Sequence, residues 1–157
     1  MGAGNSNFGF MLADWPELAQ HARRAEQFAR IDPRASMFYA RYTAERLVEW
    51  LYKVEPVLAL PYKDDLNALL NEPAFKNLVG GVGNKFTIIR KAGNNAVHNP
   101  VNPTILGAEL VLKELHHVCY WLARNYSKNG SQLPPSLAFD AGLLAPVPKA
   151  AVPQQSP

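Results

Sequence analysis

The residues with the most chemical potential lie in one short stretch, "IIRKAGNNAVHNPVNP", at positions 88–103. If this stretch is helical, Arg90, Asn94 and His98 follow one another at four-residue steps and share one face. An imidazole can act as general base or acid on a ribose hydroxyl, and a guanidinium can neutralise a phosphate. The spacing is therefore compatible with a ribonuclease site in which His98 works with Asn94 and with Arg90 or Lys91.

A structural role explains the same stretch, and the spacing favours it. Gly93 costs roughly 1 kcal/mol against alanine inside a helix, and close approach of another helix is the simplest reason for its presence. Polar side chains beside it would hydrogen-bond the carbonyls at the helix end and the turn that follows. The side chains expected to do this are Asn94, Asn95 and His98. Arg90 would then pair with a carboxylate, and Glu45 is the candidate.

The surrounding segments are predicted to be helices. Residues 14–31 begin with Asp14 as an expected N-cap, and residues 32–56 begin with Asp32 as cap and a proline after it. Two short helices are expected near Pro73, another over 84–98, and the clearest one over 103–127. Apolar residues recur at three- and four-residue steps, and no alternating strand pattern appears. We therefore expect an all-α bundle of about five to six helices.

The second of these helices carries more apolar surface than one stripe. Phe38, Tyr42 and Trp50 widen the stripe that begins at Met37, so we expect this helix to be covered on more than one side.

The composition divides the chain into three parts. Residues 1–12 form a lead-in, residues 13–128 the bundle, and residues 129–157 a linker. The last segment, "LLAPVPKAAVPQQSP" at 143–157, is rich in proline and alanine and lacks periodicity, so we expect a disordered tail. A linker at this place predicts that further domains follow it.

Charge points to one interval of interest. The net charge of +3 is too mild for a general polyanion binder. However, residues 73–108 contain no acidic residue, so the interval is either a solvated basic face or a patch that faces phosphate. The cations expected to contact nucleic acid are Lys76, Lys85, Arg90 and Lys91.

Several other classes of site are excluded. The stretch "GGVGNKF" lacks the adjacent glycine, lysine and hydroxyl of a phosphate loop. The cluster "ELHHVC" offers His116 at a ligand spacing, but its neighbour Cys119 lies on the apolar stripe, so we expect no metal and no cofactor. Cys119 is the only cysteine, which excludes an intrachain disulfide and favours the cytoplasm. No apolar run reaches the length of a membrane span.

Four segments carry a resemblance to a known family. They are "SNFGF" at 6–10, "DPRASMFYARYTAERLVEWLY" at 32–52, "RKAGNNAVH" at 90–98 and "YWLARNY" at 120–126. Together they resemble an uncharacterised helical domain often found at the N-terminus of the R (restriction) subunit of type I restriction–modification enzymes and of related helicase-like proteins. The likeness covers residues 6–127. It implies that the nuclease and ATP-driven translocase modules of the parent chain follow the linker.

That domain is in turn similar to the HEPN superfamily of helical bundles, which includes metal-independent ribonucleases. The nuclease motif of the superfamily is an arginine, usually followed by a polar residue, with a histidine four to six residues after the arginine. Aligning this histidine with His98 places Asn94 at the polar position and Gly93 at the arginine position. The resemblance therefore implies a HEPN-like scaffold that has lost its catalytic cation.

Taken together, these patterns predict a non-catalytic DNA-binding or assembly module of a type I restriction R (endonuclease) subunit. Its expected partners are duplex DNA phosphates and other domains or subunits of a restriction complex, with a homodimer left open and no membrane. The first alternative is a HEPN-type ribonuclease that uses His98 with Arg90 or Lys91. The second is a bundle that binds only other proteins.

Overall fold

Six α-helices account for most of the chain in the computed structural model, which describes residues 6–147. They are α1 (Pro16–Phe28), α2 (Pro33–Val54), α3 (Leu66–Asn71), α4 (Pro73–Val79), α5 (Gly83–His98) and α6 (Ile105–Tyr126). Short 3-10 helices lie at Gly9–Met11, Gly80–Val82, Gly130–Gln132 and Ala141–Leu143. The described residues contain no strand, so the predicted all-α fold is confirmed.

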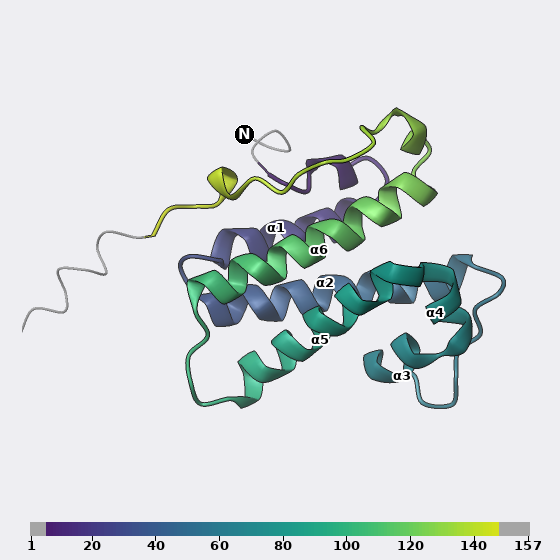
Figure 1. Cartoon of the computed structure of the whole chain (residues 1–157), viewed down its shortest axis with the longest axis horizontal. Coiled ribbons are helices and arrows are strands. Elements are labelled where there is room, and N and C mark those ends of the chain that lie inside the picture. The colour runs from purple at the N-terminus through teal and green to yellow at the C-terminus, as the bar shows by residue number, and fades with distance from the viewer. Residues whose placement is uncertain (1–5, 148–157) are drawn as a thin grey trace, which may run out of the picture.

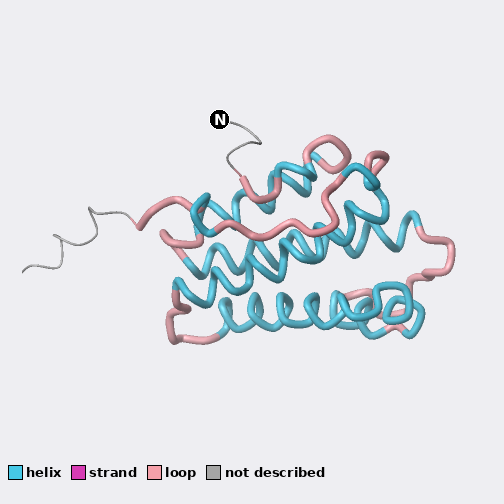
Figure 2. The backbone as a smooth tube through the Cα atoms, turned by 45° about the horizontal axis from the view of Figure 1, so that its top comes forward, coloured by secondary structure: helices cyan, strands magenta, loops and turns pink. Residues whose placement is uncertain are grey.

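The four long helices run side by side, and α3 and α4 sit together at one end of the bundle (Figure 1). The tube view shows the same arrangement from a second direction (Figure 2). Helix α2 packs against α1, α5 and α6, which makes it the central rod. Within residues 6–147, none of the helices combines the length and apolar character that crossing a bilayer requires.

Local signals explain where the long helices begin. The carboxylate of Asp32 accepts a hydrogen bond from the Ala35 N–H at 3.2 Å, as its predicted role as N-cap requires. The predicted cap at Asp14 is wrong, because α1 has no side-chain cap. Asp14 instead accepts a hydrogen bond from the Ser127 hydroxyl at 2.6 Å, which ties the start of α1 to the end of α6.

The apolar stripes meet in one core. Its fully buried large side chains are Phe8, Met11, Leu47, Leu51, Leu66, Leu69, Phe75, Phe86, Ile89, Leu112, Leu115 and Leu122. Cys119 is buried among them as predicted, and burial raises the pKa of its thiol. The expectation that α2 is covered on more than one side is wrong at Phe38, whose surface is 44% exposed.

Helices α2 and α5 approach each other most closely at Gly93. This residue is buried, and a Cβ atom on it would lie only 2.6 Å from the Cβ of Arg41 and 2.7 Å from its Cδ. Such distances lie well inside van der Waals contact. The close approach predicted from the glycine is therefore present, and α2 supplies the neighbouring side chain.

The described part of the predicted linker, residues 129–147, folds back beside α6 and the N-terminal segment (Figure 1). The side-chain amide of Asn7 donates to the Asp140 carbonyl at 3.0 Å and accepts from the Asp140 N–H at 2.7 Å. The buried carboxylate of Glu26 holds Asn7 in place by accepting from its backbone and side-chain N–H groups. Leu144 is buried. Residues 148–157 of the predicted tail lie outside the described residues.

A pair of glycine substitutions tests the contact between α2 and α5. We expect Gly93→Ala to lower the free energy of unfolding by about 1–3 kcal/mol, because overpacking outweighs the gain of about 1 kcal/mol in helix propensity. Gly81→Ala is the matched control, since no atom lies within 4 Å of the Cβ it would add. Urea unfolding measures both. A Gly93→Ala protein as stable as the wild type would contradict the contact.

Candidate functional site

The predicted site residues lie along α5. Arg90 and Asn94 are half-buried, whereas His98 is exposed in the last turn of the helix. In the part of the chain that the structure describes, the side chains of Asn94, Asn95 and His98 make no hydrogen bond. The bracing of the helix end that we expected from these three side chains therefore comes from elsewhere.

Arg34 of α2 fastens the turn between α5 and α6. Its guanidinium donates to the carbonyls of Ala96 and Asn99 and, at 3.0 Å, to the side-chain oxygen of Asn102. The Asn99 side chain closes the turn by accepting from the Val101 N–H at 2.9 Å. A guanidinium carries five donors in a fixed fork, so it can hold several carbonyls that a single exposed imidazole cannot reach.

The cations of the acid-free interval do not share one face. Lys85 forms an ion pair with Glu114 of α6 at 2.9 Å. Arg90 lies five residues later, which turns it by about 140° around the helix axis, towards α2. Within residues 6–147 Arg90 makes no ion pair with Glu45, so that predicted pair is not formed. The remaining two cations of this set are exposed, Lys76 on α4 and Lys91 on α5.

A different group of residues stands out instead. Among the described residues, the buried side-chain polar atoms without a hydrogen-bond partner are His21 Nδ1, Arg41 Nε, Arg46 Nε and Arg90 Nε. Arg41 and Arg46 belong to α2, His21 flanks it from α1, and Arg90 flanks it from α5. Each such atom costs about 1–3 kcal/mol. The four atoms lie along the two edges at which α2 meets α1 and α5.

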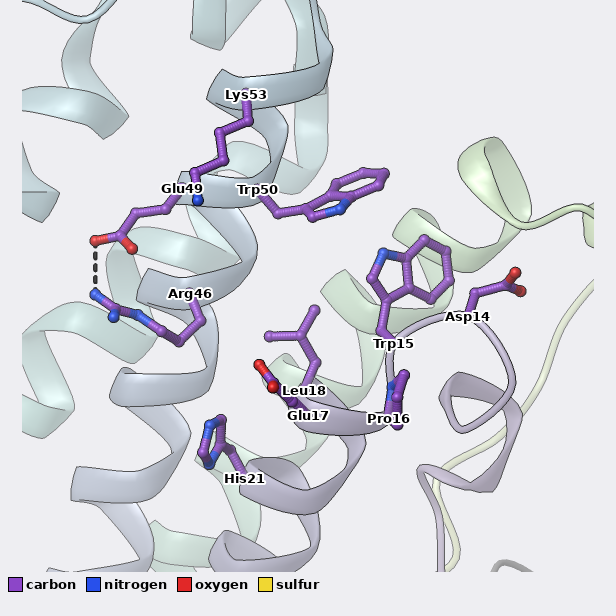
Figure 3. Close-up of a pocket in the computed structure, with 10 residues that line it drawn as sticks. All are labelled: Asp14, Trp15, Pro16, Glu17, Leu18, His21, Arg46, Glu49, Trp50 and Lys53. Carbon is purple, nitrogen blue, oxygen red and sulfur yellow. Dashed lines mark hydrogen bonds and ion pairs between the residues drawn. The ribbon is translucent and has the colours of Figure 1, made fainter.

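Two of these residues line a pocket of about 450 Å³ between α1 and α2 (Figure 3). Trp15 and Trp50 meet edge to face there, with ring centroids 5.5 Å apart. Arg46 donates to Glu49 at 2.6 Å through its terminal nitrogen, which leaves Nε unpaired. Opposite it lies His21 (Figure 3).

The environment of His21 favours its neutral form. Burial lowers the pKa of this imidazole below its usual 6.5, and the positive charges of Arg24 and Arg46 lower it further against the opposing effect of Glu17. A neutral imidazole with a free Nδ1 can donate or accept a hydrogen bond, depending on its tautomer. His21 therefore offers the pocket a hydrogen-bonding group that carries no charge at neutral pH.

The side-chain stem packed against Gly93 is that of Arg41, from α2. In the HEPN-like alignment an arginine would stand at position 93, and the side chain of Arg41 instead lies directly against this glycine. The Nε atom of Arg41 has no hydrogen-bond partner. The same holds for the Nε atom of Arg90, which lies one turn before Gly93 on α5. The seam between the two helices therefore presents two guanidinium groups with no carboxylate partner among residues 6–147.

The fold defines a helical bundle domain in which arginines line the seam between α2 and α5. Residues 23–135 match the family described as Domain of unknown function (DUF4145), and the chain belongs to that family. No curated protein matches the chain, and no solved structure does.

Reasoning from the sequence missed Arg34, Arg41, Arg46 and His21. It searched for cations in the acid-free interval, whereas these four lie on helices that also carry acidic residues. Gly93 was the one signal in the sequence that pointed to Arg41, because a glycine inside a helix indicates that another helix packs closely against it. The sequence does not say which residue of which helix that neighbour is.

Two alanine substitutions separate the roles of Arg34 and His98. We expect Arg34→Ala to lower the free energy of unfolding by about 1–3 kcal/mol, because several carbonyls lose their donor. We expect His98→Ala to change it by less than about 0.5 kcal/mol, because an exposed side chain without partners contributes little. Thermal unfolding measures both. A larger loss for His98→Ala than for Arg34→Ala would restore the structural role first expected of the histidine.

Proposed function

We propose that this domain is a non-catalytic DNA-binding or assembly module, of the kind that the resemblance places at the N-terminus of a type I restriction R subunit. The observation that supports DNA binding is the pair of unpaired guanidinium groups of Arg41 and Arg90 at the seam between α2 and α5. Guanidinium forks match the geometry of phosphate oxygens. Contacts of this kind position a duplex without reading its sequence.

The proposed contact surface keeps Arg90 but not the other cations of the acid-free interval. Lys85, which the sequence placed in the nucleic-acid patch, already has Glu114 as its partner. Arg90 keeps its proposed role, and Arg41 joins it from α2. In a restriction complex, the ATP-driven and nuclease steps would belong to other domains of the subunit, and sequence recognition to another subunit.

A charge-removal series tests the seam. We expect Arg41→Gln with Arg90→Gln to weaken binding of a short duplex at low salt, and to reduce the slope of log K against log salt by about 1–2, because each phosphate contact contributes about 0.9. Lys63→Gln with Lys128→Gln removes the same charge from two exposed lysines and serves as control. Fluorescence anisotropy across a salt titration provides the measurement.

A second pair, Lys85→Gln with Lys91→Gln, tests the patch expected from sequence. If this pair alone weakens binding, DNA contacts the acid-free interval and not the seam. If none of the three double variants changes the affinity, the domain does not bind duplex DNA through either surface, and the assembly role remains.

The ribonuclease alternative has one observation in its favour. The side-chain stem of an arginine, Arg41, lies against Gly93, the position at which the HEPN-like alignment expects a cation. General acid–base cleavage would also need the imidazole of His98 within hydrogen-bond reach of the same nucleotide. His98 is exposed at the end of α5, one turn beyond Asn94.

Cleavage of RNA in the presence of a chelator tests this alternative. We expect the wild-type protein to leave a single-stranded RNA intact, because His98, the candidate general base, is exposed at the end of α5 and not held beside the seam arginines. The matched variants are His98→Ala and Arg41→Gln. Metal-independent cleavage by the wild type that both variants abolish would replace the non-catalytic proposal with the ribonuclease.

A further inference from the structure

The outward side of α2 carries an aromatic ridge, which we define as Phe28, Phe38, Tyr39 and Tyr42. Phe38 lies nearly parallel to Tyr42, with ring centroids 6.3 Å apart and an angle of 12° between the rings. Phe38 and Tyr39 meet edge to face, with ring centroids 5.4 Å apart. Tyr39 in turn stacks on Phe28 of α1, with ring centroids 5.8 Å apart and an angle of 7° between the rings. Phe38 stands at the centre of the ridge and remains 44% exposed, although large aromatic side chains normally bury most of their surface.

Arginines surround this ridge. The guanidinium of Arg24 lies 5.9 Å from the Tyr39 ring centroid, and that of Arg46 lies 5.1 Å from the Tyr42 centroid. Arg41 follows Phe38 by three residues on α2 and is therefore its neighbour on the helix surface. The Nε atoms of Arg41 and of Arg90 on α5 have no partner within residues 6–147.

Two carboxylates share this side of α2 without cancelling its charge. Glu49 is occupied by its ion pair with Arg46. Glu45 is half-buried, and in the described part of the chain it makes no ion pair. The adjoining pocket adds Asp14, Glu17 and Lys53. Apart from the Arg46–Glu49 pair, the four cations Arg24, Arg41, Lys53 and Arg90 exceed the three carboxylates Asp14, Glu17 and Glu45 by one, so the surface is weakly cationic.

The ridge continues into the pocket between α1 and α2. His21 belongs to both, because its ring meets the edge of Tyr42 at 4.8 Å and also lines the pocket beside Arg46 (Figure 3). The Nδ1 of His21 and the Nε of Arg46 are the two unpaired polar atoms there. A planar group that enters the pocket would find an aromatic wall formed by Trp15 and Trp50 and hydrogen-bonding groups opposite it (Figure 3).

We propose that this side of α2 binds single-stranded nucleic acid, with bases stacked on Phe38, phosphates held by Arg41 and Arg90, and one base at the pocket of His21 and Arg46. This inference rests on the proposed function, because it uses the same seam arginines, but it replaces the duplex with an unpaired strand as the preferred ligand. In a duplex the base faces are stacked on one another and give nothing to an exposed ring. An unpaired strand offers both a regular row of phosphates and free base faces, which is what an aromatic surface between arginines selects.

Binding of the full chain to four labelled probes tests the preference. The probes are oligo(dT), oligo(rU), a fully abasic backbone and a duplex, each about 20 nucleotides long. We expect oligo(dT) or oligo(rU) to bind about tenfold more tightly than both the abasic strand and the duplex. Which of the two binds better distinguishes DNA from RNA as the natural strand. Equal affinity for the abasic strand, or preference for the duplex, would overturn the inference.

Substitutions at Phe38 test the stacking itself. We expect Phe38→Ala to weaken binding of the preferred single strand about tenfold and to change that of the abasic strand by less than about twofold. Phe38→Leu keeps an apolar side chain without a π face and should behave like Phe38→Ala, whereas Phe38→Trp should retain affinity. Leu110→Ala removes an apolar side chain of similar exposure, 52%, from α6 and is the matched control. An unchanged affinity in Phe38→Leu, or an equal loss on all probes, would contradict stacking.

The seam arginines separate this inference from the proposed function. If Arg41→Gln with Arg90→Gln weakens all probes while the Phe38 variants change none, phosphate binding stands and the single-strand inference fails. If the Phe38 variants act on single strands while the arginine pair has no effect, base stacking stands and the phosphate site lies elsewhere.

Discussion

The arrangement of the bundle depends on the contact between the backbone of α5 at Gly93 and the side-chain stem of Arg41 on α2. One absent Cβ lets two long helices approach each other, and it fixes their register along the common axis. That register lays the Arg41 stem against α5 three residues after Arg90 and lets Arg34 reach the turn after α5. The spacing of two packed rods thus determines where three arginines lie. A larger residue at position 93 would separate the helices and disperse these charges.

Helix α2 therefore has two sides with opposite energetics. One side contributes fully buried residues such as Leu47 and Leu51 to the core. Three cations form ion pairs among residues 6–147: Arg30 with Glu109, Arg46 with Glu49 and Lys85 with Glu114. Along the edges of α2, the Nε atoms of Arg41, of Arg46 and of Arg90 on α5 have no hydrogen-bond partner within residues 6–147, although Arg46 pairs with Glu49 through its terminal nitrogen. Natural proteins break local rules of polar satisfaction mainly at functional sites, where a ligand supplies the missing partner.

Much of the fold followed from the sequence, because helix periodicity and the Asp32 cap are local signals. The cap at Asp14 failed, since Ser127 lies 113 residues away and takes the same carboxylate.

The candidate site could be predicted from the sequence only in part. Spacing placed Arg90, Asn94 and His98 along one helix, but what these side chains touch depends on the register of α2 against α5. Arg34, which fastens the turn, precedes its acceptor Ala96 by 62 residues. The hydrogen bond between Asn7 and Asp140 joins residues 133 positions apart, and the composition of the segment around Asp140 does not predict it.

The most direct test of the account is the nuclear magnetic resonance signal of each arginine Nε–H group during titration with a short single-stranded oligonucleotide. The central claim is that a nucleic acid supplies the hydrogen-bond partners that the outward side of α2 lacks. We predict that the Nε–H signals of Arg41, Arg46 and Arg90 shift together as the strand binds. The signal of Arg30 should stay in place, because its Nε already donates to Glu109 at 2.8 Å. Shifts that spare these three arginines, or that follow the lysines of α4 and α5 instead, would contradict the account.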